Sequence, residues 1–219
     1  MPHSKDEIRQ AIIEAGSDHS EMFGFPEKAD GLHLQQDPDE YADFVCFMAN
    51  EVPPATLALD IGIASGGQTK FLRDFYAVDK TIIVDIGEHP KFPHWERIKK
   101  SVKTEIVLEI IQDSHGKAVA EALKPFAGQV DFAFIDGDHS YKGLKKDINL
   151  TKTVAKKGAL FVLHDTLEVP DCKRVFDELM TDEDFELVRN FDRRFGISVW
   201  RYLAVRGPDK PWWSRILGS

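Results

Sequence analysis

The sequence contains few cysteines and lacks any long apolar run. Of its 219 residues only Cys46 and Cys172 are cysteines, and they stand far apart without the close spacing of metal ligands. This scarcity favours free thiols in a reducing cytoplasm over a disulfide. No segment reaches the length of a membrane span, and the first residues lack the apolar core of a signal peptide. We therefore expect a cytoplasmic protein that does not associate with membranes.

Negative charges outnumber positive charges. The chain has 28 Lys and Arg residues against 37 Asp and Glu residues, which gives a net charge of −9. This balance argues against a general binder of nucleic acid or anionic membranes, so we expect a small-molecule partner. There is no internal repeat or low-complexity segment, and the length suffices for one sizeable core.

Short apolar runs rich in β-branched residues alternate with helical patterns over most of the chain. The runs are 57–63, 81–84, 105–111, 130–135 and 159–163, and the helical patterns between them are 68–76, 92–101, 116–124 and 141–155. After a further helix at 171–180, the runs 185–188 and 197–203 have no helix between them and should pair as an antiparallel hairpin. The sequence therefore predicts an α/β fold with a doubly wound, Rossmann-like sheet of seven strands, mostly parallel with the last strand antiparallel.

Two helical patterns, 5–15 and 39–50, precede a break at Pro53-Pro54. We therefore predict an N-terminal helical segment over 1–52 that covers the ligand site, a main domain over 53–205 and a C-terminal tail over 206–219. The tail carries Pro208, Pro211, Trp212 and Trp213. These residues either pack on their own domain or form the contact of a homodimer, because interfaces favour aromatic residues.

The first predicted strand ends in a glycine-rich turn, Asp60-Ile-Gly62-Ile-Ala-Ser65-Gly66-Gly67. Glycines at such a turn let the backbone approach a ligand and point amides at it. The spacing differs from the Gly-x-Gly-x-x-Gly of dinucleotide enzymes, which weakens the alternative of an NAD-dependent oxidoreductase. Asp85 ends the second strand, 23 positions after Gly62, where an acid can bind ribose hydroxyls, although it could equally cap a helix. Together the turn and the acid indicate a nucleoside ligand.

The third predicted strand ends in Gln112-Asp113-Ser114. Asp113 or Ser114 could cap the helix that starts near residue 116, because both side chains accept hydrogen bonds from helix amides. This strand end also neighbours the adenine position in such folds. The two roles are compatible.

Ionisable side chains crowd the ends of the fourth and fifth strands. The fourth run ends in Asp136-Gly-Asp138-His139, and the fifth ends in His164-Asp165. Because the carboxyl ends of adjacent parallel strands share one edge, Asp136, His139, His164 and Asp165 are expected to converge. Two carboxylates brought this close repel each other unless a cation or a proton compensates them. The cluster therefore indicates either a divalent metal site or a hydrogen-bonded network without metal.

Two other functions are possible for a chain with these residues. His139, His164 and one aspartate also match a two-histidine, one-carboxylate iron triad of an oxygenase or hydroxylase. Such triads usually sit in double-sheet barrels, which the strand–helix alternation does not resemble. The other alternative is a catalytically inactive nucleotide-binding protein of the same fold, against which the retained histidine and acidic pair argue.

With these motifs the chain resembles the class I S-adenosylmethionine-dependent methyltransferases. The glycine turn, Asp85, the segment Phe134-Ile-Asp-Gly-Asp-His-Ser-Tyr141 and the His164-Asp165 pair carry the resemblance, which covers about residues 30–205. More narrowly, the chain is similar to methyltransferase family 24 and to small-molecule O-methyltransferases that use a divalent metal, such as the catechol, caffeoyl-coenzyme A and macrolide-sugar types. The resemblance implies an S-adenosylmethionine-binding methyltransferase domain over 53–205 and an enzyme that methylates a hydroxyl group of a small molecule.

The resemblance also implies roles for single residues. The cofactor contacts would come from Asp60, Gly62, Ser65, Gly67, Asp85, Asp113, Ser114 and Asp136, with Asp85 at the ribose and Asp113 and Ser114 at the adenine. A divalent metal, Mg or Mn, would bind to Asp136, His164 and Asp165, and the catalytic pair would be Asp136 and His139, with His139 as general base. Metal-dependent relatives carry an acid at position 164, so histidine there favours a softer metal such as Mn or Zn. The identity of the acceptor, and whether it is oxygen or nitrogen, stay open.

Overall fold

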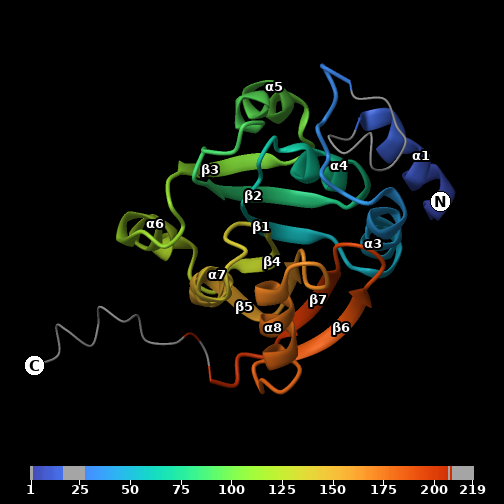
Figure 1. Cartoon of the computed structure of the whole chain (residues 1–219). Helices are drawn as coiled ribbons and strands as arrows, with labels where there is room; N and C mark the ends of the chain where they lie inside the picture. The colour runs from blue at the N-terminus through green and yellow to red at the C-terminus, as the bar shows by residue number, and fades with distance from the viewer. Residues whose placement is uncertain (1, 17–27, 207, 209–219) are drawn as a thin grey trace, which may run out of the picture.

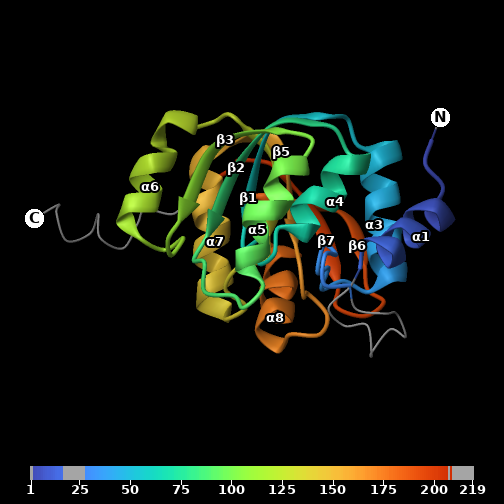
Figure 2. The same cartoon turned by 90° about the horizontal axis from the view of Figure 1, so that it is seen from above.

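The computed structural model describes residues 2–16, 28–206 and 208, which form a twisted sheet between two layers of helices (Figures 1 and 2). The strands are β1 (Ala55–Ile61), β2 (Val78–Asp85), β3 (Glu105–Ile111), β4 (Val130–Ile135), β5 (Ala155–Leu163), β6 (Phe185–Phe191) and β7 (Ile197–Tyr202). They lie in the order β3-β2-β1-β4-β5-β7-β6, and β7 runs antiparallel to both of its neighbours. The predicted Rossmann-like sheet with an antiparallel last strand is therefore confirmed.

Helices cover both faces of the sheet (Figure 2). One face carries α1 (Lys5–Ala15), α3 (Pro38–Glu51), α4 (Gly67–Phe75) and the short α5 (Trp95–Ile98), and the other carries α6 (Lys117–Leu123), α7 (Tyr141–Val154) and α8 (Pro170–Leu179). In the central strand β4, Phe132 and Phe134 pack toward α3 while Ala133 and Ile135 pack toward α7. A strand buried on both faces favours apolar residues, which explains the apolar run at 132–135, whereas Asp131 near the start of β4 is only half-buried.

The helix expected at 92–101 differs most from its prediction. The chain there forms a 3-10 turn (Phe92–His94), the four-residue α5 and a second 3-10 turn (Lys99–Ser101). The segment is anchored by Trp95, which is fully buried and lies so close to Gly66 that a Cβ atom there would be 2.0 Å from its ring.

Residues 30–37, called the strap below, lead from the N-terminal region into α3. Asp37 caps α3 by accepting hydrogen bonds from the amides of Asp39 and Glu40. The strap lies directly on the glycine turn, because a Cβ atom at Gly67 would be 2.0 Å from the carbonyl oxygen of Leu32. Glycine at position 67 thus permits the close approach of two backbones.

Both cysteines are free, as predicted, with Cys46 half-buried and Cys172 buried. Burial raises the pKa of the Cys172 thiol to about 12, so this group is not a nucleophile at neutral pH. Within the described ranges no helix is long and apolar enough to cross a membrane. Pro211, Trp212 and Trp213, and the homodimer contact predicted for them, lie outside the described residues.

Candidate active site

The carboxyl ends of β1 to β5 open into one cavity of about 570 Å³, a size typical of small-molecule sites. Its walls come from the strap, the glycine turn, the loops after β2 to β5 and the turn between β6 and β7. Most residues predicted for the site line this cavity: Gly62, Ser65, Asp85, Asp113, Ser114, Asp136, His139, His164 and Asp165. Asp60 and Gly67 do not line it.

The carboxylate of Asp60 is used inside the protein rather than in the cavity. Its Oδ1 atom lies 2.9 Å from Nη2 of Arg73, and its Oδ2 atom accepts a hydrogen bond of 2.7 Å from the hydroxyl of Thr69. The side chains of Asp60 and Arg73 are both almost fully buried. The structure therefore gives Asp60 a structural role in place of the cofactor contact that the resemblance implied.

We expect Asp60→Asn to destabilise the fold without a direct effect on ligand binding. An asparagine would leave the buried guanidinium of Arg73 without its counter-charge, and breaking a buried pair in this way costs about 3–5 kcal/mol. Chemical denaturation should show this loss. Glu186→Gln removes the exposed ion pair with Arg201 and should change stability by less than about 1 kcal/mol. A fully stable Asp60→Asn protein with weakened cofactor binding would restore the original prediction.

Asp85 organises the middle of the cavity. Its Oδ2 atom accepts hydrogen bonds from the amides of Ile63 (2.7 Å) and Ala64 (3.2 Å), and Oδ1 accepts one from the amide of Gly87 (2.6 Å). One carboxylate thus fixes both the glycine turn and the loop after β2. Each carboxylate oxygen can accept about two hydrogen bonds. Oδ1 accepts one within the protein and can therefore accept a second one from a hydroxyl group of a ligand.

Gly62 brings the first and fourth strand ends together. Its φ of +75° lies in the left-handed region, and a Cβ atom there would be 2.2 Å from the carbonyl oxygen of Asp136. Only glycine fits both requirements without strain. The glycine turn is therefore packed directly against the loop that carries Asp136.

The end of the cavity near β3 is held by a carboxylate from α7. Asp147 is fully buried; its Oδ1 atom accepts a 2.6 Å hydrogen bond from the hydroxyl of Ser114 and lies 3.2 Å from Nε2 of His115. The hydrogen bond to Asp147 raises the pKa of His115. The other carboxylate oxygen of Asp147 lies 3.5 Å from the amide of Asp138. Asp147 thereby connects the loop after β3 with the loop after β4.

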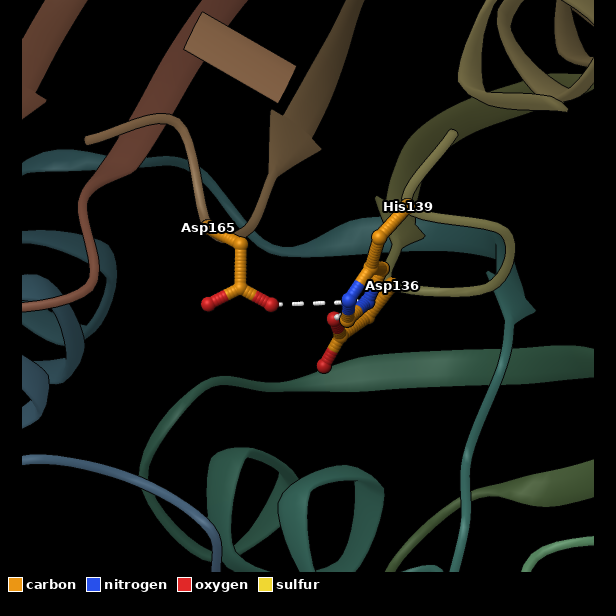
Figure 3. A group of neighbouring side chains, drawn as sticks. All are labelled: Asp136, His139 and Asp165. Carbon is orange, nitrogen blue, oxygen red and sulfur yellow. Dashed lines mark hydrogen bonds and ion pairs between the residues drawn. The ribbon is translucent and has the colours of Figure 1, made fainter. Parts of the chain in front are cut away.

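Four ionisable side chains meet at the opposite end of the cavity, as predicted. Nε2 of His139 lies 3.1 Å from Oδ1 of Asp136 and 3.4 Å from Oδ2 of Asp165 (Figure 3). Nδ1 of His164 lies 3.4 Å and 3.2 Å from the same two oxygen atoms. Nitrogen and oxygen atoms thus alternate around one small volume.

The charges in this cluster stabilise one another. Burial by itself would raise the pKa of Asp136, but the nearby charge of His164 and the hydrogen bond from His139 bring it below its ordinary value. Burial would lower the pKa of His164, whereas the two carboxylates raise it well above its ordinary value. The hydrogen bond to Asp136 raises the pKa of His139 to about 8. The two carboxylates therefore attract positive charge strongly into the space between them.

In metal-free protein we expect His139 to titrate with a midpoint of about 8, above its ordinary 6.5. Because Asp136 favours the imidazolium, the proton leaves at a higher pH, and the neutral base becomes dominant only above the midpoint. A divalent cation added to the carboxylates should lower the midpoint. Proton NMR of the ring, assigned with a His139→Gln variant, measures it. A metal-free midpoint at or below 6.5 would show that Asp136 does not act on the ring.

The two histidines differ in how firmly they are held. The side chain of His139 is 44% exposed, whereas that of His164 is 4% exposed. Nε2 of His164 is 2.8 Å from Oε1 of Gln36 in the strap, and Gln36 is also buried. His164 is thus fixed from two sides, while His139 stays accessible from the cavity.

The turn between β6 and β7 closes the cavity and is held by Glu40 of α3. The buried carboxylate of Glu40 accepts hydrogen bonds of 2.8–3.2 Å from four consecutive backbone amides, those of residues 193–196. Phe195 in this turn lines the cavity, and its ring lies near His164 with 5.9 Å between centroids. Helix α3 therefore positions one wall of the site.

Sequence reasoning missed Asp147, His115 and Glu40. Asp147 lies in the middle of a helix and Glu40 in a first helical turn, where an acid is ordinary because it favours the helix dipole. Their partners stand 33 and up to 156 positions away along the chain. His115 directly follows Ser114, and its position beside a predicted ligand loop was the one local signal available.

Comparison with known families agrees with this geometry. Residues 59–166 match the model of methyltransferase family 24, which is described as a methyltransferase domain. These residues are a methyltransferase domain. The match begins in β1 and ends just after Asp165, so it contains the glycine turn, Asp85 and the whole ionisable cluster. The strap with Gln36, and Glu40, lie outside it.

One curated protein also resembles part of the chain. An uncharacterized protein of Acanthamoeba polyphaga mimivirus is 27% identical over 113 residues, which cover 49% of this chain and 50% of that protein. The alignment thus spans about half the length of the curated relative.

Solved structures of methyltransferases share the fold. The N-methyltransferase NodS from Bradyrhizobium japonicum, in complex with S-adenosyl-L-homocysteine, has a TM-score of 0.56 at 13% identity and covers 80% of this chain and 93% of its own. A candidate O-methyltransferase from Klebsiella pneumoniae has a TM-score of 0.59 at 11% identity, covering 93% and 92%. A methyltransferase from Geobacter sulfurreducens has a TM-score of 0.56 at 13% identity, covering 93% and 91%. At these identities the likeness concerns the fold.

Proposed function

We propose that the protein transfers a methyl group from S-adenosylmethionine to a hydroxyl oxygen of a small molecule. The observation that carries this proposal is the layout of the cavity, in which a glycine turn and a ribose-type acid lead to a cluster of two carboxylates and two histidines. The methyltransferase domain supplies the reaction class. The cluster supplies a base at the place where the acceptor would be deprotonated.

The ribose, adenine and methionine parts of S-adenosylmethionine would each lie at a different strand end of the cavity. Asp85 would accept the ribose hydroxyls, because its Oδ1 atom keeps an acceptor position that faces the cavity. Ser114 would lie at the adenine, and Gly62 and Ser65 at the methionine part. In the NodS complex the bound S-adenosyl-L-homocysteine belongs to a protein of the same fold, which supports this choice of cofactor.

The cluster also fits a divalent metal. Asp136, His164 and Asp165 offer oxygen and imidazole donors, and the buried Nδ1 of His164 has no hydrogen-bond partner among the described residues. Asp136, His139 and Asp165 each offer a ligand atom within 4.8 Å of the others. We propose Asp136, His164 and Asp165 as the metal ligands, with His139 left free by its greater exposure. A divalent cation at this place lowers the pKa of a hydroxyl group bound to it.

The residues of the chain then have separate tasks. S-adenosylmethionine carries its methyl group on a sulfonium, which is already electrophilic, so the protein has to hold the acceptor oxygen in line with that group. His139, in its neutral form, donates Nε2–H to Asp136 and takes the hydroxyl proton on Nδ1. The resulting imidazolium is stabilised by Asp136 and Asp165, which both lie close to Nε2. Phe195 and the strap exclude water from the reacting groups.

The walls of the cavity favour a small acceptor without a phosphate group. None of the described residues that line it is Lys or Arg, whereas five are aspartates: Asp85, Asp113, Asp136, Asp138 and Asp165. Phosphate recognition normally uses arginine, lysine or helix amides. Together with the net charge of −9, this argues for a small molecule rather than a nucleic acid.

Neither alternative function gains support. The sheet is open, with β3 and β6 at its edges, unlike the barrels that hold iron triads in oxygenases. The family match concerns methyl transfer and gives no support to an iron oxygenase. An inactive nucleotide-binding protein would have no use for an accessible His139 held 3.1 Å from Asp136 and 3.4 Å from Asp165.

Transfer of a labelled methyl group from S-adenosylmethionine to a panel of catechols, polyols and amines tests the proposal. We expect product with at least one hydroxyl acceptor and its loss when EDTA removes divalent cations. Transfer that EDTA does not affect would remove the metal from the proposal but leave the methyltransferase. Product with amines alone would replace oxygen by nitrogen as the acceptor.

A further inference from the structure

One contact joins the cluster to the N-terminal strap. Nε2 of His164 lies 2.8 Å from Oε1 of Gln36, and the two residues are 5% and 2% exposed. An amide oxygen can only accept a hydrogen bond, so the ring has to carry its proton on Nε2 and donate it to Gln36. This hydrogen bond fixes the tautomer and the orientation of a buried imidazole.

The orientation turns the other ring nitrogen toward the two carboxylates. Nδ1 of His164 lies 3.2 Å from Asp165 and 3.4 Å from Asp136, yet among the described residues it makes no hydrogen bond of good geometry. When a cation displaces the proton that the carboxylates hold on Nδ1, the other proton stays on Nε2, and the Nδ1 atom presents a lone pair to the same space that the carboxylates face. A buried lone pair beside two carboxylate oxygens is the donor set of a metal centre rather than of a packing contact.

We propose that Gln36 makes His164 a nitrogen ligand and thereby selects a transition-metal ion such as Zn²⁺ or Co²⁺ over Mg²⁺. This inference rests on the metal centre proposed above and specifies its metal. Mg²⁺ prefers oxygen ligands and keeps several waters, whereas imidazole suits Zn²⁺ and its neighbours in the series. A hydrogen bond from the second ring nitrogen of a ligating histidine typically contributes 10–100-fold to metal affinity.

Through Gln36 the N-terminal region would influence which metal the cluster binds. Gln36 lies outside the methyltransferase domain model at 59–166, while His164 lies inside it. The metal preference would therefore be set by a contact between the common domain and a segment added to it. Gln35, the next residue in the strap, points elsewhere and pairs with His89 at 3.3 Å, so it offers a matched control.

The test measures metal binding itself, without an activity assay. Protein stripped of metal is titrated calorimetrically with Mg²⁺ and with Co²⁺, and the visible absorption of bound Co²⁺ reports nitrogen coordination. Because most sites bind Co²⁺ more tightly than Mg²⁺, the decisive quantity is the change in that preference between variants. The variants are His164→Glu, Gln36→Leu and Gln35→Leu, each checked for folding by circular dichroism.

For His164→Glu we expect the ratio of Co²⁺ to Mg²⁺ affinity to fall at least about tenfold, because an oxygen donor replaces nitrogen. For Gln36→Leu we expect Co²⁺ to bind about 10–100-fold more weakly, with a smaller effect on Mg²⁺. Gln35→Leu should leave both affinities unchanged. An unchanged ratio in folded His164→Glu and Gln36→Leu proteins would overturn the proposal, and so would wild-type protein that binds no Co²⁺ at millimolar concentration.

Titration of the same wild-type sample with S-adenosylhomocysteine separates this inference from the proposed function. If S-adenosylhomocysteine binds while the metal tests fail, only the metal inference is lost. If S-adenosylhomocysteine does not bind either, the proposed methyltransferase function is lost as well.

Discussion

Replacing His139 by alanine is expected to lower kcat for methyl transfer by about 10²–10⁴-fold, the usual contribution of a general base. The neutral imidazole takes the acceptor proton, and its imidazolium form is stabilised by Asp136 at 3.1 Å and Asp165 at 3.4 Å. The affinity for S-adenosylmethionine should change little, because His139 acts on the acceptor. Initial rates with labelled cofactor, combined with calorimetric titration of the same protein, separate the two effects.

His89 offers a control for this variant. It also lines the cavity, but it comes from the loop after β2 and pairs with Gln35 of the strap. His89→Ala should therefore alter KM for the acceptor more than kcat. If His139→Ala kept a kcat within about tenfold of the wild-type value, its role as the base would be excluded.

Replacing Glu40 by glutamine is expected to lower the free energy of unfolding by about 3 kcal/mol or more. The carboxylate accepts hydrogen bonds from four consecutive amides of residues 193–196, and it is 1% exposed. A glutamine offers one acceptor oxygen and turns an NH₂ group toward amides that also donate. Each buried donor that loses its partner costs about 1–3 kcal/mol. Denaturation with urea measures the loss.

The same variant should weaken the acceptor site, because the turn that Glu40 holds carries Phe195. We expect a raised KM for the acceptor in whatever fraction stays folded. Asp39→Asn is the matched control, since Asp39 lies next to Glu40 but makes partly exposed ion pairs with Arg9 and Arg193. It should change stability by less than about 1 kcal/mol. Equal stability of the two variants would show that the turn does not depend on Glu40.

The sequence predicted the sheet well because its signal is local. Strands such as β4 are buried on both faces, so they stand out as apolar runs bounded by helices. The rule that parallel strands present their carboxyl ends at one edge then brought Asp136, His139, His164 and Asp165 together without further information. The helix predicted at 92–101 was right in its bounds but wrong in its regularity, because the segment is a four-residue α-helix between two 3-10 turns and is anchored by the buried Trp95.

The contacts that hold the site were harder to predict because they join distant parts of the chain. Gln36 and His164 are 128 positions apart. No sequence pattern around a glutamine in a loop predicts which distant residue it will contact. For Asp60 the resemblance implied a cofactor contact, whereas in the structure its carboxylate pairs with a buried arginine. Its buried partner, Arg73, lies in the last turn of α4, where arginine is ordinary because it favours the helix dipole. Which charged residues pair with each other depends on how the chain folds, so such pairs are hard to predict from the sequence.

The central claim is that the cavity between Asp85 and Asp136 binds S-adenosylmethionine, and calorimetric titration tests it most directly. The account predicts saturable binding of S-adenosylmethionine and S-adenosylhomocysteine to the wild-type protein and none of NADH. It also predicts at least about tenfold weaker binding by Asp85→Asn, since a hydrogen bond to a charged group contributes about 1.5–3 kcal/mol. Absence of binding by the folded wild-type protein at millimolar S-adenosylmethionine would contradict the account.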